Sequence, residues 1–98
     1  MPKTKPTTEA IRQQVMNEWI FVCQARNGRP TNNKDFGKAV HISESTAARR
    51  KNDYRKTTLD ELLRMYDSYR VPVDTMLQYF KALVLASKVG SSNAGNHY

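Results

Sequence analysis

The chain has 98 residues, of which 39% are hydrophobic and 26% are charged, and its formal net charge is +7. A chain of this length holds one small domain, and its near-average content of charged residues argues against disorder throughout. The positive surplus favours a polyanionic partner, either nucleic acid or an anionic membrane surface.

Cysteine and histidine are scarce, which limits the chemistry that the chain can perform. Cys23 is the single cysteine, so an intramolecular disulfide is excluded, and Cys23, His41 and His97 are too few for a structural zinc site. We expect no metal and no cofactor, and we expect Cys23 to be a small buried hydrophobe. No run approaches the roughly 20 apolar residues of a membrane span, and no signal peptide is visible. These features predict a cytoplasmic protein without a membrane partner.

The first predicted helix begins after an arm at residues 1–6, which contains two prolines and two lysines and is expected to be flexible. Thr7 or Thr8 can cap the helix. The helix should end near residue 26, because Asn27, Gly28 and Pro30 are breakers. Its apolar residues recur at helical spacing, namely Ile11, Val15, Trp19 and Val22.

Two short helices are predicted next, with a tight connection at residues 41–42 and a cap at Ser43. Polar residues at 31–33 can cap the first helix, in which Phe36 and Val40 share one face. The second helix runs from about residue 44 to 52 and has little to bury beyond Ala47 and Ala48. Its outer face is therefore free for another role.

Two longer amphipathic helices complete the predicted fold. Thr58 and Glu61 fit a capping box for a helix to about residue 69. Asp74 can cap a last helix that ends near residue 89, before a polar tail at 90–98 that we expect to be disordered. The fold class is all-α, a compact bundle of about five helices over residues 7–89 that contains a helix-turn-helix. The expected core includes Trp19, Phe36, Leu62, Leu63 and Phe80.

The segment NKDFGKAVHISESTAARRKN, residues 33–52, resembles the helix-turn-helix of the lambda Cro and repressor (XRE-type) family of phage regulators. Asn33 opens the first helix, Phe36 and Val40 occupy its two apolar places, and Gly37 occupies the place of a small residue. His41 replaces the usual turn glycine, and a positive φ there would be strained. Ala47 and Arg50 also depart from the family pattern. The length and the long final helix are similar to those of small lambdoid activators of lysogeny.

The resemblance implies a non-enzymatic, sequence-specific regulator of phage or prophage type that binds double-stranded operator DNA in a bacterial cytoplasm. Its second short helix would enter the major groove. The base-contacting residues expected on this helix are Glu44, Ser45, Ala48, Arg49 and Asn52. The residues expected to contact DNA phosphates are Asn33, Lys34, Lys38, Ser43, Arg50, Lys51, Arg55 and Lys56.

A regulator of this kind is expected to act as a homodimer or higher homo-oligomer, held by the last helix. Leu77, Phe80 and Val84 are expected to pack on the leucines of residues 59–63. Apolar surface would then remain for dimer contact, at Met76, Tyr79 and Leu83. The alternative is that both faces of this helix fold onto the first helix.

Two other functions fit the same sequence. The first is an antitoxin, which would bind a toxin as well as its own operator. The second is an anti-repressor that acts only through protein contacts, and it predicts neither a sequence preference nor salt-steep DNA binding. A surface-bound membrane helix is a weaker fit, since Lys81 and Lys88 are the only basic residues in the last helix.

Overall fold

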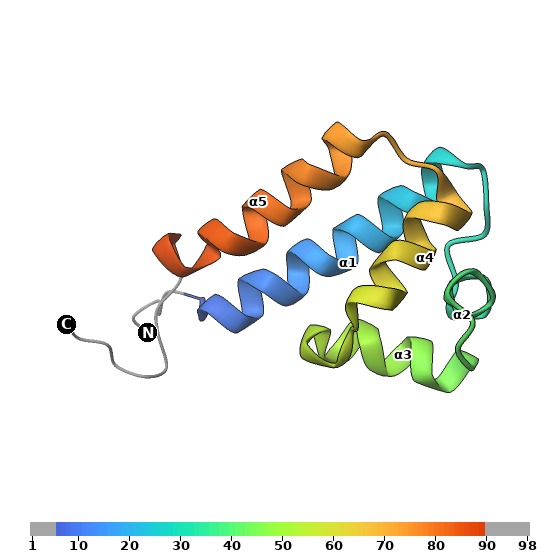
Figure 1. Ribbon diagram of the computed structural model, residues 1–98. Helices are drawn as coiled ribbons and strands as arrows, with labels where there is room; N and C mark the ends of the chain where they lie inside the picture. Colours follow the sequence, from blue (N-terminus) through green and yellow to red (C-terminus); the bar gives the residue numbers. More distant parts are fainter. Residues whose placement is uncertain (1–5, 90–98) are drawn as a thin grey trace.

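The computed structural model describes residues 6–89, which form five α-helices and one turn of 3-10 helix (Figure 1). The all-α fold and the five predicted helices are confirmed. Within this range, no helix combines the length and apolar character that a membrane crossing requires. The predicted tail and all of the predicted arm except Pro6 lie outside the described residues. The elements are α1 (Thr8–Arg26), α2 (Asn33–Val40), α3 (Glu44–Asn52), η1 (Tyr54–Lys56), α4 (Leu59–Tyr69) and α5 (Val73–Val89).

Most helices begin at the polar residues that the sequence indicated. The side chain of Thr7 accepts a hydrogen bond from the backbone of Ala10 and caps α1. Asn32 caps α2, and Ser43 caps α3. The Thr58–Glu61 capping box of α4 is present in full. Because each cap satisfies a backbone donor within a few residues, the sequence alone is sufficient to place these helix starts.

The start of α5 differs from the prediction. The helix begins at Val73, and Asp74 lies inside the first turn instead of preceding it. The carbonyl oxygen of Pro72 already accepts hydrogen bonds from the backbone amides of Thr75 and Met76. An acidic side chain in this first turn still stabilises the helix through its dipole.

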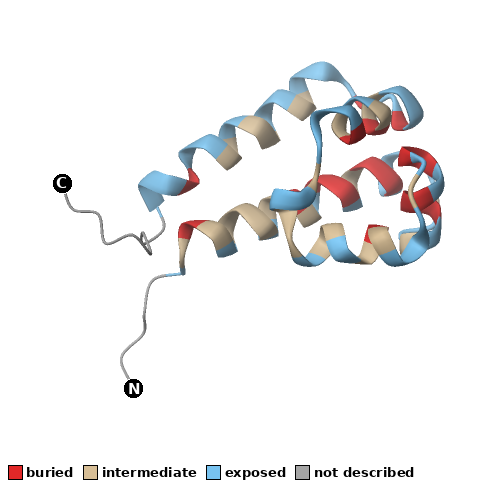
Figure 2. Ribbon diagram, turned by 60° about the horizontal axis from the view of Figure 1, so that its bottom comes forward, coloured by how far each residue is buried: buried red, intermediate tan, exposed pale blue. Residues whose placement is uncertain are grey.

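The core lies where the C-terminal half of α1 meets α2, α3 and α4 (Figure 2). Cys23 is fully buried among hydrophobic residues, as predicted, and this burial raises the pKa of its thiol to about 12. By contrast, α5 is mostly exposed, and Ala86 is its one buried residue. The largest fully buried side chains are Trp19, Tyr69, Phe36, Ile20, Met65, Gln24, Val40 and Cys23.

The face of α4 that enters the core was predicted wrongly. Leu63 is 52% exposed, Leu59 is 69% exposed, and Leu62 is only partly buried against the core. The buried residues of α4 are Glu61, Met65 and Tyr69, which lie four apart on one face. The apolar pattern assigned the buried positions of α4 to leucines, because the sequence could not show that Glu61 has a buried partner.

The packing of α5 also differs from the expectation, because this helix lies against α1 and not against α4. The rings of Trp19 and Tyr79 are 5.4 Å apart between centroids. The guanidinium Nε of Arg12 donates a hydrogen bond of 2.8 Å to the carbonyl oxygen of Leu83.

The residues expected at the dimer surface consequently lie elsewhere. Met76 and Tyr79 pack against the core, and Leu83 is half-buried. Leu77 and Val84, which were expected to face inwards, are 52% and 68% exposed, while Phe80 is half-buried. The alternative contact with the first helix is therefore correct for one face of α5, and the opposite face is uncovered.

Candidate nucleic-acid interface

Helices α2 and α3 approach each other closely at their three-residue connection. His41 adopts the left-handed conformation at the end of α2, with φ of 62°. This is the positive φ that the replacement of a turn glycine suggested. A Cβ atom at position 37 would lie only 2.7 Å from the carbonyl oxygen of Ile42. Gly37 is therefore required for α3 to begin against the side of α2.

The inner side of α3 is fixed to the core by one small residue and two long ones. Ala47 is fully buried. Arg50 donates two hydrogen bonds to Glu61, of 2.9 and 3.1 Å, and both side chains are largely buried. The Nζ atom of Lys51 lies 5.8 Å from the ring centroid of Phe36. These contacts set the rotation of α3 about its own axis.

Arg50, which the sequence assigned to phosphate contact, is thus held in an ion pair with Glu61, and Lys51 is half-buried beside Phe36. The Arg50 hydrogen bonds hold the pKa of Glu61 below its usual value, which indicates that the pair is ionised. Burial lowers the pKa of Lys51. The sequence alone could not show that an acid on α4 and an aromatic ring on α2 lie within reach of these two residues.

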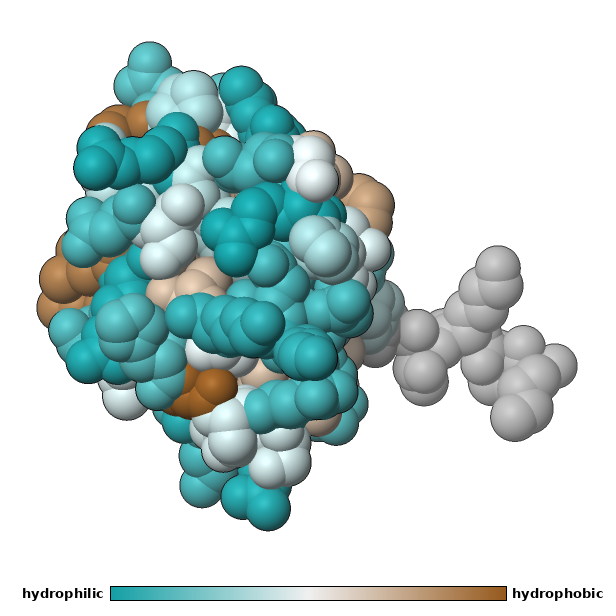
Figure 3. Space-filling view, turned by 90° about the vertical axis from the view of Figure 1, so that its right-hand side faces the viewer, coloured by the Kyte–Doolittle hydropathy of each residue, from teal (hydrophilic) through white to brown (hydrophobic). Residues whose placement is uncertain are grey.

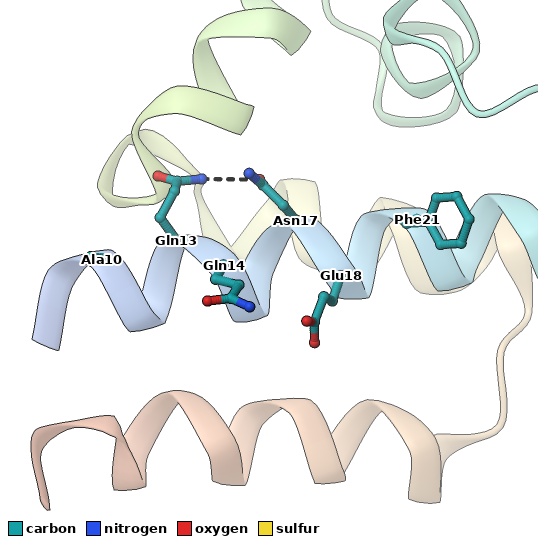
Figure 4. Close-up of a pocket in the computed structure, with 6 residues that line it drawn as sticks. All are labelled: Ala10, Gln13, Gln14, Asn17, Glu18 and Phe21. Atoms are coloured by element: carbon teal, nitrogen blue, oxygen red, sulfur yellow. Dashed lines mark hydrogen bonds between the residues drawn. The ribbon is translucent and has the colours of Figure 1, made fainter. Parts of the chain in front are cut away.

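The C-terminal end of α3 is held by two amide side chains from α1. Gln13 and Asn17 hydrogen-bond each other and point towards α3 (Figure 4). Gln13 donates to the carbonyl oxygen of Arg50, and Asn17 donates to that of Lys51 at 3.0 Å. Gln13 also accepts from the backbone amide of Tyr54. Carbonyls in the last turn of a helix lack partners within the helix, so α1 stabilises this terminus directly.

The C-terminal end of α2 is held in the same way by α4. Arg64 donates a hydrogen bond of 3.0 Å to the carbonyl oxygen of Val40. Ser68 donates one of 2.8 Å to the carbonyl oxygen of Ala39. Both short helices are therefore anchored by side chains from longer helices, which compensates for their small apolar content.

The N-terminal turn of α2 contains a buried carboxylate that joins three segments. Asp35 accepts hydrogen bonds from Arg29 at 2.6 Å, from Gln24 at 3.3 Å and from the Tyr69 hydroxyl at 3.0 Å. Burial alone would raise the pKa of Asp35, but these donors outweigh it and hold that pKa below its usual value. The ionised carboxylate connects α2 to the end of α1 and the end of α4.

The outer side of α3 carries the side chains that the sequence assigned to base contact. Glu44, Ser45, Arg49 and Asn52 are exposed, and Ala48 is half-buried between them. Arg49 is exposed and lines an open depression of about 450 Å³. That depression is lined by Arg49, Arg50, Asn52, Asp53 and Lys56. The fold therefore places Arg49, Asn52 and Lys56 together.

The remaining residues predicted for phosphate contact are distributed around this face. Lys34 and Lys38 are exposed on α2, while Asn33 is half-buried beside them. Ser43 is exposed but already caps α3. Arg55 contacts Asp53 at 3.0 Å and is nevertheless 68% exposed. The end of the molecule where α2 lies is mainly hydrophilic, with small hydrophobic patches (Figure 3).

Sequence reasoning missed the side chains that position this site, namely Gln13, Asn17, Gln24 and Asp35. The one available signal was the spacing of Gln13 and Asn17, four residues apart beside the apolar stripe of α1. That spacing fits a solvated helix face equally well. Among residues 6–89, no group of three or more His, Cys, Asp and Glu side chains is placed to hold a metal ion.

Comparison with known proteins identified no significant match to this chain. No protein-family model matches the chain, and neither the curated proteins nor the solved structures include a significant match.

Proposed function

We propose that the chain is a sequence-specific DNA-binding regulator in which α3 enters the major groove of double-stranded DNA. One helix fits into that groove, and specificity comes from side chains on its outer face. In this proposal Arg49 contacts a guanine edge, Asn52 contacts an adenine edge or a phosphate, and Glu44 accepts from a cytosine amine. Ser45 and Ala48 fill the surface between them. Two copies would bind an inverted or direct repeat.

The observation that carries this proposal is the contrast between the two sides of α3. The inner side is held by Ala47, by the Arg50–Glu61 ion pair and by the Gln13–Asn17 amides. The outer side has four exposed polar residues. A helix that reads bases needs both properties, because its contacts depend on a fixed rotation and an uncovered surface.

Charge supports the same reading. The segment 33–56 contains seven Lys and Arg residues and three Asp and Glu residues. Two of the acids, Asp35 and Asp53, are paired with Arg29 and Arg55. Lys34, Lys38, Arg49 and Lys56 remain exposed and available to phosphates.

Selection of binding sites from random duplexes, followed by footprinting, tests the proposal. On the selected site, Arg49→Ala should lose discrimination at one base pair, by ~1–3 kcal/mol, because a bidentate guanine contact is lost. Lys34→Ala is the matched control for charge, and it should weaken binding to all duplexes alike and reduce the salt slope by about one unit. Failure to select any sequence from the pool would contradict the proposal.

A further inference from the structure

The exposed face of α5 has a regular apolar stripe. Val73, Leu77 and Val84 are 45%, 52% and 68% exposed, and the half-buried Phe80 lies beside them. These four residues are spaced by four, three and four positions, so they share one side of the helix. Met76 and Tyr79 instead pack against the core, and Ala86 is buried. An apolar helix face of this kind normally has a partner.

We infer that this stripe is the contact between two copies of the chain, with the two α5 helices packed antiparallel. The spacing of the stripe reads the same in both directions. In an antiparallel pair, Leu77 of each copy therefore meets Phe80 of the other, and Val73 meets Val84. A second copy is a complementary occupant for this face without any change of backbone.

The flanking charges select the antiparallel arrangement. Asp74 and Lys81 are both exposed along the same edge of the stripe. In the antiparallel alignment, Asp74 of one copy lies opposite residue 83 of the other copy, two positions from Lys81. At a rise of about 1.5 Å per residue, Asp74 and Lys81 are therefore offset by about 3 Å along the helix axis. This produces two symmetric ion pairs. In a parallel pair, Asp74 and Lys81 of one copy would lie across the stripe from those of the other copy, so these ion pairs would not form.

Association through α5 does not require DNA, and this contact leaves α3 uncovered. The residues of α1 that bind α5 include Arg12 and Trp19, whereas those that bind α3 are Gln13 and Asn17. Figure 1 shows α3 and α5 on different sides of α1. Association through α5 and the proposed contact of α3 with DNA can therefore fail separately.

Sedimentation of the full chain without DNA tests the inference. The chain should be dimeric at about 50 μM, a concentration suited to a small interface. Leu77→Lys should be monomeric under the same conditions. Leu63→Lys is the matched control, because Leu63 on α4 is also 52% exposed, and it should remain dimeric. A monomeric wild-type chain, a dimeric Leu77→Lys variant or a monomeric Leu63→Lys variant would each overturn the inference.

A charge exchange and a cross-link test the direction of the pair. Asp74→Lys should weaken association roughly tenfold, and Asp74→Lys combined with Lys81→Asp should restore it. A mixture of Val73→Cys and Val84→Cys chains should form mixed disulfides between the two variants. Disulfides only between identical variants would show a parallel pair and overturn the proposed arrangement. Cys23 does not interfere, because it is fully buried.

Binding to a random duplex of roughly 20 base pairs separates this inference from the proposed function. The folded Leu77→Lys monomer should still bind that duplex with a salt-dependent affinity within about threefold of wild type per chain. Loss of association without loss of this binding supports the α5 contact alone. Loss of both in Leu77→Lys, but not in Leu63→Lys, would contradict the claim that the two surfaces are independent.

Discussion

The end of the molecule that contains α2, α3 and α4 and the edge formed by α5 are stabilised in different ways. At the first, buried polar side chains join separate elements of the fold, as in the Asp35 hydrogen bonds and the Arg50–Glu61 pair. At the second, α5 packs one apolar side on α1 and leaves the other exposed.

This difference separates two kinds of requirement on a small domain. Polar hydrogen bonds are directional, so they fix the rotation and the ends of short helices that have little to bury. Apolar packing is less directional, so it can hold a helix whose outer side remains exposed. The α2–α4 end is suited to presenting α3 in one orientation, and the α5 edge is suited to association.

Acidification should cause the largest loss of stability, because it acts on the two carboxylates of the α2–α4 end and not on the apolar contact of α5. The pKa values of Asp35 and Glu61 are both lower in the folded chain than in the unfolded chain. The stability that they contribute is therefore complete above about pH 4.5 and is lost as the pH falls through their folded values. Urea unfolding measured from neutral pH downwards should show this loss. A free energy of unfolding that stays constant below that pH would contradict the role given to the two carboxylates.

Removal of the Asp35 carboxylate alone should be the most damaging single substitution at the α2–α4 end. Asp35→Ala leaves Arg29, Gln24 and Tyr69 without their acceptor, and we expect a loss of about 2–4 kcal/mol in the free energy of unfolding. Asp60→Ala is the matched control, because its ion pair with Arg64 is exposed, and it should cost at most about 1 kcal/mol. Equal losses in urea unfolding would show that the buried network has no special importance.

A methyl group at position 37 should disturb the approach of α2 and α3. Gly37→Ala places its Cβ against the backbone of Ile42, which cannot move as a side chain could, so we expect a cost of about 1–3 kcal/mol. Gly28→Ala should cost less, about 1 kcal/mol, since a Cβ there meets nothing within 4 Å and only its positive φ is unfavourable. Thermal unfolding of both variants measures which one loses more stability. A larger loss for Gly28→Ala would contradict the close contact between position 37 and Ile42.

The smallest effect should be a gain in stability. His41 adopts a left-handed conformation that glycine adopts without strain. His41→Gly should therefore stabilise the chain by roughly 0.5–1 kcal/mol, after the greater entropy of glycine in the unfolded chain is included. A lower unfolding temperature for this variant would indicate that the imidazole makes a stabilising contact.

Much of the candidate site could be predicted from the sequence. The exposed face of α3 follows from residues spaced along one helix, and the positive φ of His41 was suggested by the family resemblance, in which a glycine usually occupies that turn position. The direction of Arg50 and Lys51 could not be predicted in this way. Their partners, Glu61 and Phe36, belong to other helices, and several rotations of α3 fit the same local pattern.

The sequence by itself determined where most of the helices begin, because caps act through hydrogen bonds between residues a few positions apart. It also determined that α5 is apolar on more than one side. Only the tertiary structure decided that α5 lies on α1, that Leu63 is exposed and that Glu61 is buried. Those choices depend on competition among several amphipathic faces, and contacts between distant residues settle that competition.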